Sequence, residues 1–141
     1  MAAIFYQNFT IGILGGGQLG RMLIQSGIDL NLNFKVLDPD AHAPCSQLTD
    51  FTCGKLTDYQ TVWNFGQSCD LITIEIENVN TQALSDLAKA GKKVFPQPAI
   101  IELIQDKRKQ KEFFTANQIP TAEFILVENR NDVSSHSNFL P

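Results

Sequence analysis

The chain has 141 residues, of which 43% are hydrophobic and 18% are charged, and its formal net charge is −4. This length fits one domain with its own core, and the composition is that of an ordinary soluble globular protein. The acidic balance argues against nucleic-acid binding, no run approaches the roughly 18 apolar residues of a membrane helix, and the N-terminus lacks the pattern of a signal peptide. We therefore expect a cytoplasmic protein without a nucleic-acid or membrane partner.

The cysteines and histidines show neither disulfide nor metal-binding spacing. Cys45, Cys53 and Cys69 are odd in number and form no C-x-x-C pair, and His42 has only Cys45 near it while His136 has no Cys or His nearby, which is too few ligands for a metal site. Reduced thiols in a cytosolic protein are the simplest interpretation, and no metal site is predicted.

Short apolar runs alternate with amphipathic runs along the first 95 residues. The apolar runs predict strands at residues 9–15, 34–38, 50–54, 69–78 and 92–96. Helical spacing predicts helices at residues 18–30, 57–68, 80–91, 98–106 and 107–119, the second of them capped by Thr57. A further strand is expected at residues 121–129, followed by a weakly patterned polar tail. This alternation predicts an α/β fold, a Rossmann-like open parallel sheet with helices on both faces.

A glycine-rich loop follows the first predicted strand. The segment "GILGGGQLGRM" holds Gly15-x-Gly17-x-x-Gly20, with Gln18 at the expected start of a helix. Free amides and the helix dipole favour an anion at such a loop, at the carboxyl end of the sheet. Asp38 ends the second strand 18 positions after Gly20, which fits the ribose-binding acid of a dinucleotide site. NAD or FAD, another phosphate ligand, and tight strand–helix packing without a ligand all remain open.

Two acidic residues follow the fourth predicted strand. Glu75 and Glu77 alternate with isoleucines in "TIEIENV", so in a strand both carboxylates would face one side. This strand adjoins the first one in the expected topology, which would place Glu77 and Asn78 beside the glycine loop. The pair could bind hydroxyls, amines or a metal, or form a solvated strand end with Glu75 paired to a lysine.

A basic run opens the last predicted helix. Lys107, Arg108, Lys109 and Lys111 lie within five positions. Such a run usually forms a solvated helix face, and four bases around a helix cannot all reach one ligand. One or two of them have the reach to contact a phosphate.

Three segments together resemble a known family: "IGILGGGQLGRMLIQSG", "DLITIEIENV" and "VFPQPAIIELIQDKRKQKEFF". They are similar to the N-terminal part of the 5-(carboxyamino)imidazole ribonucleotide synthases, ATP-grasp ligases also called the ATPase subunit of phosphoribosylaminoimidazole carboxylase. The resemblance spans residues 10–120 approximately. It implies the use of ATP, Mg2+ and bicarbonate to carboxylate 5-aminoimidazole ribonucleotide to its N5-carboxyamino product in de novo purine (IMP) biosynthesis.

The resemblance also implies roles for single residues. The Rossmann-like part would be the pre-ATP-grasp domain, which helps to bind the ribonucleotide. The implied substrate-binding residues are Gly17, Gln18, Leu19, Glu77 and Asn78. Lys107 would approach the ATP phosphates at a position where relatives often carry arginine, whose bidentate fork a lysine lacks. No catalytic residue and no metal ligand is carried over.

Members of this family are much longer than this chain. Their central glycine-rich ATP loop, acidic Mg2+ ligands and C-terminal basic residues have no counterpart here, and residues 132–138 match the family poorly. We therefore expect an N-terminal fragment that is inactive alone and homodimeric when full length. Residues 1–97 would form the pre-ATP-grasp domain, and residues 98–141 a helical linker and the first strand of a truncated ATP-grasp domain. The alternatives are a sister ATP-grasp enzyme (a formate-dependent glycinamide ribonucleotide formyltransferase or a biotin carboxylase), a dinucleotide-binding Rossmann module, and a scaffolding domain without a ligand.

Overall fold

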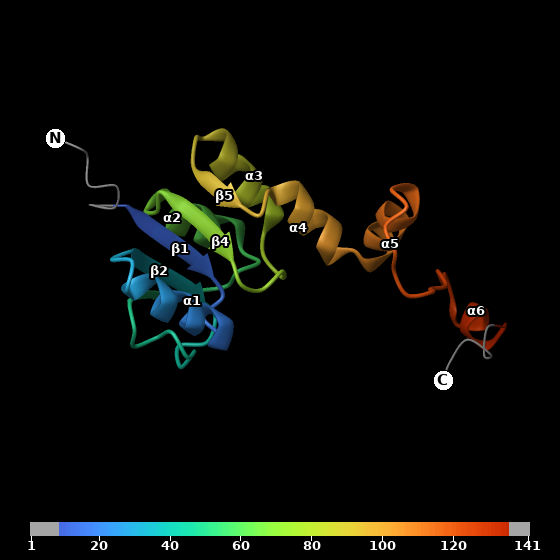
Figure 1. Cartoon of the computed structure of the whole chain (residues 1–141), viewed down its shortest axis with the longest axis horizontal. Helices are drawn as coiled ribbons and strands as arrows, with labels where there is room; N and C mark the ends of the chain where they lie inside the picture. Colours follow the sequence, from blue (N-terminus) through green and yellow to red (C-terminus); the bar gives the residue numbers. More distant parts are fainter. Residues whose placement is uncertain (1–8, 136–141) are drawn as a thin grey trace. The chain divides into compact units, whose positions relative to one another are not determined.

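A computed structural model describes residues 9–135, so His136 lies outside the described residues. The chain forms two compact units that divide between Gln105 and Asp106. The first unit contains, in chain order, β1 (Thr10–Leu14), α1 (Gln18–Ile28), β2 (Asn33–Asp38), β3 (Asp50–Cys53), α2 (Tyr59–Gln67), β4 (Leu71–Ile74), α3 (Thr81–Lys89), β5 (Lys93–Phe95) and α4 (Pro98–Gln105). The second contains α5 (Lys107–Ala116) and α6 (Arg130–Ser135) (Figure 1).

The five strands form one parallel sheet in the order β3-β2-β1-β4-β5. Ile11 of β1 lies opposite Phe34 of β2 on one side and Leu71 of β4 on the other. The strand order reverses between β1 and β4, so the crevice expected to bind ligands lies at the carboxyl ends of these two strands. The predicted Rossmann-like sheet, with the first and fourth strands as neighbours, is confirmed.

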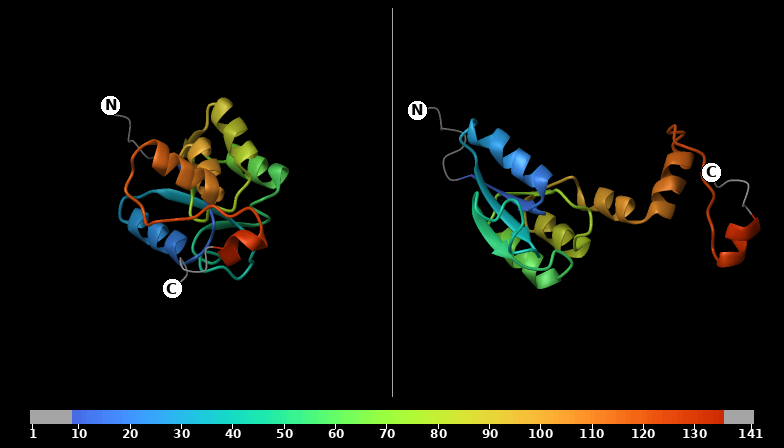
Figure 2. Two further views of the ribbon diagram at one scale, coloured as in Figure 1. Left: turned by 90° about the vertical axis from the view of Figure 1, so that its right-hand side faces the viewer. Right: turned by 90° about the horizontal axis from the view of Figure 1, so that it is seen from below.

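Helices cover both faces of this sheet. Alternation along β1 sends Ile13 toward Ile24 of α1 and Leu14 toward the opposite face. On that opposite face, side chains of α2, α3 and α4 form the larger core with Leu37, Ile72 and Val94. Figure 2 shows α1 on one side of the strands and α2 and α3 on the other. The α1 face is therefore covered by a single helix.

Two details of the predicted elements are wrong. The fourth strand ends at Ile74 rather than continuing to residue 78. The N–H groups of Glu75 and Ile76 both donate to the Leu14 carbonyl, where β1 ends and the pairing stops. The N-cap of α2 is Asp58 rather than Thr57, because its carboxylate accepts from the Thr61 N–H.

The end of the first unit also differs from the predicted boundary at residue 97. α4 packs against α3, and Ile101 joins the larger core. The compact unit therefore extends through Gln105. Whether residues 98–141 begin a second domain of a longer protein stays a prediction.

The strand predicted at residues 121–129 does not form in the second unit. A strand needs a paired neighbour, and no ladder partner for this segment lies within residues 9–135. Instead, the Arg108 guanidinium donates to the Val127 carbonyl and pairs with Glu128, and Lys111 Nζ donates to Thr121 Oγ1. Two of the four bases of the run, Arg108 and Lys111, therefore hold this segment on α5.

The short helix α6 was missed, although its signal lies in the sequence. The Asn129 side chain accepts from the N–H groups of Asn131 and Asp132. In return, the Asp132 carboxylate accepts from the N–H groups of Glu128 and Asn129. These are the reciprocal bonds of a capping box, with Asn and Asp as the two capping side chains.

Asn80 connects α3 to the preceding loop, and its loss should be measurable. Its Oδ1 accepts from the Ala83 N–H at 2.8 Å, and its Nδ2 donates to the Thr57 carbonyl at 3.0 Å. Asn80→Ala should lower the free energy of unfolding, measured in urea, by about 1–2 kcal/mol. Asn80→Asp keeps the capping oxygen and should lose less. Equal losses in the two variants would contradict the capping role.

Candidate functional site

The glycine loop joins β1 to α1 at the carboxyl edge of the sheet. Gly15 has φ +108°, a conformation that is strained for any residue with a side chain. A Cβ atom at Gly20 would lie 2.9 Å from the Gly15 carbonyl oxygen, so α1 approaches the loop as closely as it does only with glycine there. Glycine is thus required at position 15 by the backbone conformation and at position 20 by the close approach of α1.

The carboxylate of Glu75 lies against this loop. A Cβ atom at Gly15 would be 2.6 Å from Glu75 Oε2, and one at Gly17 would be 2.9 Å from Glu75 Oε1. Gly17 is the N-cap of α1 and provides no side-chain cap, so the positive end of the helix dipole faces this carboxylate. A phosphate placed here would meet a like charge. The arrangement favours a ligand that offers hydroxyl or amine donors.

A hollow of about 220 Å³ opens beside the loop, between α1 and the ends of β1 and β4. Among residues 9–135, Glu75 is the one charged residue that lines it. The residues that line it are Ile13, Leu19, Gly20, Leu23, Ile74 and Glu75. The hollow lies at the crevice that the strand order predicts for a ligand, with apolar walls and one carboxylate acceptor.

The structure separates the predicted acidic residues. Because β4 ends at Ile74, strand alternation does not place Glu75 and Glu77 on one face. Glu75 lines the hollow, whereas Glu77 does not. Asn78 lines another hollow of about 200 Å³, with Pro39, Lys55 and Thr57 from the ends of β2 and β3. Of these two acids, Glu75, which the sequence left undecided, is thus the one that lines the hollow beside the loop.

The other predicted residues lie as follows. Gln18 is exposed at the first turn of α1, and Leu19 is 66% exposed while still lining the 220 Å³ hollow. Leu23 and Ile74 complete its walls and were missed, although both are apolar residues next to the motifs that the sequence singled out. Lys107 belongs to the second unit, where its Nζ donates to Gln110 Oε1 at 3.4 Å. Its contact with ATP stays a prediction.

Asp38 does not point away toward a ribose. Its Oδ2 accepts from the Gly16 N–H at 2.6 Å, and its Oδ1 accepts from the Asp40 N–H at 2.8 Å. Both carboxylate oxygens are therefore bonded to the backbone of the chain itself. This geometry weakens the dinucleotide interpretation, which requires Asp38 to hold a ribose hydroxyl.

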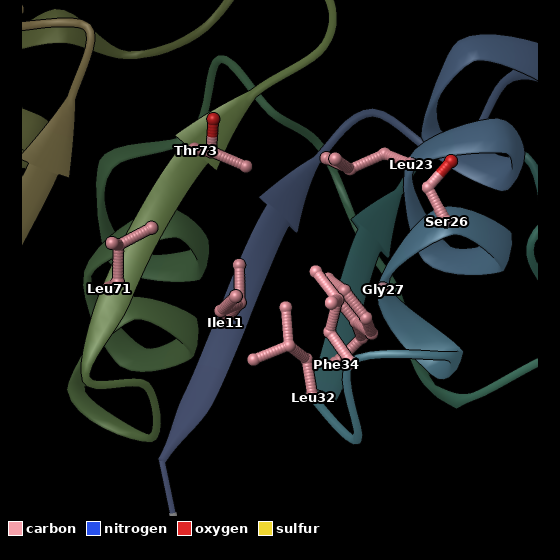
Figure 3. A pocket seen from close by; sticks show the side chains of 9 residues that line it. Ile11, Leu23, Ser26, Gly27, Leu32, Phe34, Leu71 and Thr73 are labelled. Atoms are coloured by element: carbon pink, nitrogen blue, oxygen red, sulfur yellow. The ribbon is translucent and has the colours of Figure 1, made fainter. Parts of the chain in front are cut away.

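A second, larger hollow of about 280 Å³ continues along the same face and shares Leu23 with the first. Figure 3 shows its lining side chains on β1, β4 and α1 and around Phe34. Apart from the hydroxyls of Ser26 and Thr73, these side chains are apolar. The larger hollow therefore offers little for a phosphorylated ligand to bond with.

The three thiols differ in environment, and this predicts their reactivity. Cys45 and Cys69 are buried and Cys53 is exposed. Burial raises the pKa of the Cys45 thiol, with the Glu75 and Asp38 charges adding to it, and burial likewise raises the pKa of Cys69. We expect Ellman's reagent at pH 8 to modify one thiol rapidly in the native protein and three in guanidinium, because the thiolate is the reactive form. Cys53→Ser should abolish the fast phase; a fast phase that persists would contradict the assignment.

Within residues 9–135, no three or more His, Cys, Asp or Glu side chains gather in a way that could hold a metal ion. No described helix has the length and apolar character needed to cross a membrane.

Residues 8–105 match the family model described as the ribonucleotide synthetase preATP-grasp domain. The chain belongs to this family. It is 43% identical over 124 residues to the phosphoribosylaminoimidazole carboxylase of Ogataea methanolica, covering 85% of this chain and 23% of that protein. It is 37% identical over 126 residues to the N5-carboxyaminoimidazole ribonucleotide synthase of Staphylococcus aureus, covering 88% of this chain and 33% of that protein.

Solved structures agree with this preATP-grasp assignment. The N5-carboxyaminoimidazole synthase of Aspergillus clavatus, in complex with ADP and 5-aminoimidazole ribonucleotide, superposes with a TM-score of 0.80 at 36% identity. The match covers 94% of this chain and 36% of that one. The resemblance inferred from the three sequence segments is confirmed, and the chain spans about a quarter to a third of the length of these relatives.

Proposed function

We propose that this preATP-grasp domain binds the ribonucleotide in an ATP-dependent ligase that carboxylates 5-aminoimidazole ribonucleotide to N5-carboxyaminoimidazole ribonucleotide. The observation that carries the proposal is the Glu75 carboxylate, held over the glycine loop in the hollow between β1, β4 and α1. The similar Aspergillus enzyme holds ADP and 5-aminoimidazole ribonucleotide. In the complete enzyme we propose Mg-ATP and bicarbonate as co-substrates, a homodimeric assembly and a cytoplasmic role in purine biosynthesis.

Glu75 is proposed to accept hydrogen bonds from the ribonucleotide. A carboxylate can accept from ribose hydroxyls or from the exocyclic amine of the imidazole, and such charge-assisted bonds are the stronger ones. If Glu75 accepts from the amine, it also orients the lone pair of the amine nitrogen toward the bicarbonate-derived carbon that becomes the new carboxylate group. Gly17, Gln18 and Leu19 are proposed to contact the same ligand from the start of α1.

The remaining proposed contacts extend beyond the hollow. Glu77 and Asn78 are exposed on the loop after β4, and Gln105 Nε2 holds this loop by donating to the carbonyls of Glu77 and Val79. They are proposed to meet parts of the substrate outside the hollow. Lys107 is proposed to contact the ATP phosphates. These residues bind and orient, and ATP supplies the phosphoryl group that activates bicarbonate.

A titration of the 141-residue protein with 5-aminoimidazole ribonucleotide, NAD and ATP, followed by thermal shift and calorimetry, tests this function. A ligand that binds only the folded state at a hundredfold excess over Kd stabilises it by about 2.7 kcal/mol. We expect the melting temperature to rise with the ribonucleotide and not with NAD. A rise with NAD alone would contradict the proposal. No rise with any ligand would contradict ribonucleotide binding by this domain alone.

A further inference from the structure

The backbone of Gly16, in the middle of the glycine loop, is bonded through both its N–H and its carbonyl to the end of β2 and the connection that follows. The Gly16 N–H donates to Asp38 Oδ2 at 2.6 Å, and the Gly16 carbonyl accepts from the Cys45 N–H at 3.0 Å. The Cys45 thiol lies 3.6 Å from the Gly17 carbonyl, to which it donates. Loops that bind phosphate do so with free amides, whereas this Gly16 amide is already taken by the protein.

Packing holds the loop in the same place. A Cβ atom at Gly16 would lie 3.1 Å from the Asp38 Cβ, 3.2 Å from the Ala43 Cβ and 3.2 Å from Val36 Cγ1. Gly16 is not one of the three glycines of the motif, yet the space around it admits no side chain without movement of its neighbours. The loop therefore rests directly on the end of β2 and on the turn that follows.

Asp38 is itself fixed. Its Oδ1 accepts from the Asp40 N–H at 2.8 Å, and its backbone carbonyl accepts from the Gly54 N–H at 3.0 Å. Its side chain thus joins the loop to the turn after β2, and its backbone carbonyl is held by the residue after β3. Leaving a buried amide without its charged acceptor costs free energy, so the Asp38 carboxylate stabilises the loop in its observed shape.

We propose that Asp38 is a positioning residue: Asp38 holds the Gly16 N–H, the Cys45 N–H holds the Gly16 carbonyl, and together they fix the shape in which the start of α1 is presented to the ligand. Affinity at the glycine loop then depends on the β2–β3 connection, residues 39–49, none of which lines the 220 Å³ hollow. The identity of the ligand rests on the proposed function; the clamp does not.

Native-state amide hydrogen exchange, followed by NMR without ligand, tests the clamp directly. Asp38→Ala should speed the exchange of the Gly16 N–H by at least about tenfold, and Asp38→Asn, which keeps one acceptor oxygen, should speed it less. The amides of Leu84 and Val94 in the core report global unfolding and should change little by comparison. Asp50→Asn is the matched control, because it removes an exposed carboxylate paired with Lys35 at the far end of the same connection. Unchanged Gly16 exchange in both Asp38 variants would overturn the clamp.

Calorimetric titration with 5-aminoimidazole ribonucleotide, at a temperature where all variants are folded, tests its consequence. Asp38→Ala should bind about tenfold more weakly than the wild type, with Asp38→Asn between them and Asp50→Asn unchanged. Wild-type affinity in both Asp38 variants would overturn the positioning role. If the wild type itself does not bind, the proposed function fails for this chain, and the exchange experiment still decides whether Asp38 holds the loop.

Discussion

Replacing Gly15 with alanine should lower the free energy of unfolding by about 2–4 kcal/mol and push Glu75 away from the glycine loop. Two costs combine at this position. The φ of +108° is unfavourable for any L-residue with a side chain, and the added methyl group would lie 2.6 Å from Glu75 Oε2 and 3.0 Å from Ile76 Cγ2. Urea unfolding monitored by circular dichroism measures the loss.

Gly91 provides the control for this substitution. It has a similar φ of +90°, but a Cβ atom there would meet nothing within 4 Å. Gly91→Ala should therefore report the backbone strain alone, about 1–2 kcal/mol. The difference between the two variants measures the packing of Glu75 and Ile76 on the loop. If both variants lose the same stability, Glu75 does not lie against the loop as described.

Glu75→Gln should weaken binding of 5-aminoimidazole ribonucleotide about 10- to 100-fold, because a charged acceptor facing ligand donors is replaced by a neutral amide of the same shape. The melting temperature of the ligand-free protein should change little. Isothermal titration calorimetry on the variant and the wild type measures the ratio of dissociation constants.

Glu77→Gln is the matched comparison, two residues further along the same loop. Glu77 is proposed to contact the substrate from an exposed position outside the hollow, where solvent screens its charge, so Glu77→Gln should weaken binding by less than about threefold. A larger loss in Glu77→Gln than in Glu75→Gln would restore the assignment that the resemblance gave. It would contradict the placement of Glu75 as the main acceptor.

The sheet and its helices could be predicted because local pattern and tertiary structure agree along the first 105 residues. Apolar strands of β-branched residues alternate with amphipathic helices, and the right-handed crossover rule leaves few arrangements. The glycine loop could be placed for the same reason, since its spacing marks a strand end followed by a helix start.

The acidic site could not be placed from sequence because tertiary pairing decides where β4 ends. The alternation of Glu75, Ile76 and Glu77 continues the pattern of a strand, but β1 stops at Leu14, whose carbonyl takes both the Glu75 and Ile76 amides. No neighbour then remains to extend the ladder. The role of Asp38 could not be decided from sequence for a similar reason. Its spacing fits a ribose-binding acid, and only its bonds to the Gly16 and Asp40 amides show that it holds the loop.

Residues 121–129 have the composition of a strand for the same local reasons, with β-branched and aromatic residues in a row. Composition does not supply a partner, and Arg108 and Lys111 bind this segment through side chains instead. For α6, in contrast, the sequence held a local signal that was missed, in the side chains that cap the helix. Asn129 and Asp132 carry a local signal that a search for apolar periodicity overlooks.

Above all, we propose that the glycine loop and Glu75 together form the ribonucleotide face of this domain. Amide chemical-shift mapping of the 15N-labelled protein during titration with 5-aminoimidazole ribonucleotide tests it most directly. We expect the largest shifts at residues 15–19 and at Glu75, with Leu32 and Leu71 of the larger apolar hollow unaffected. Largest shifts at Leu32 and Leu71, with the glycine loop unchanged, would contradict it.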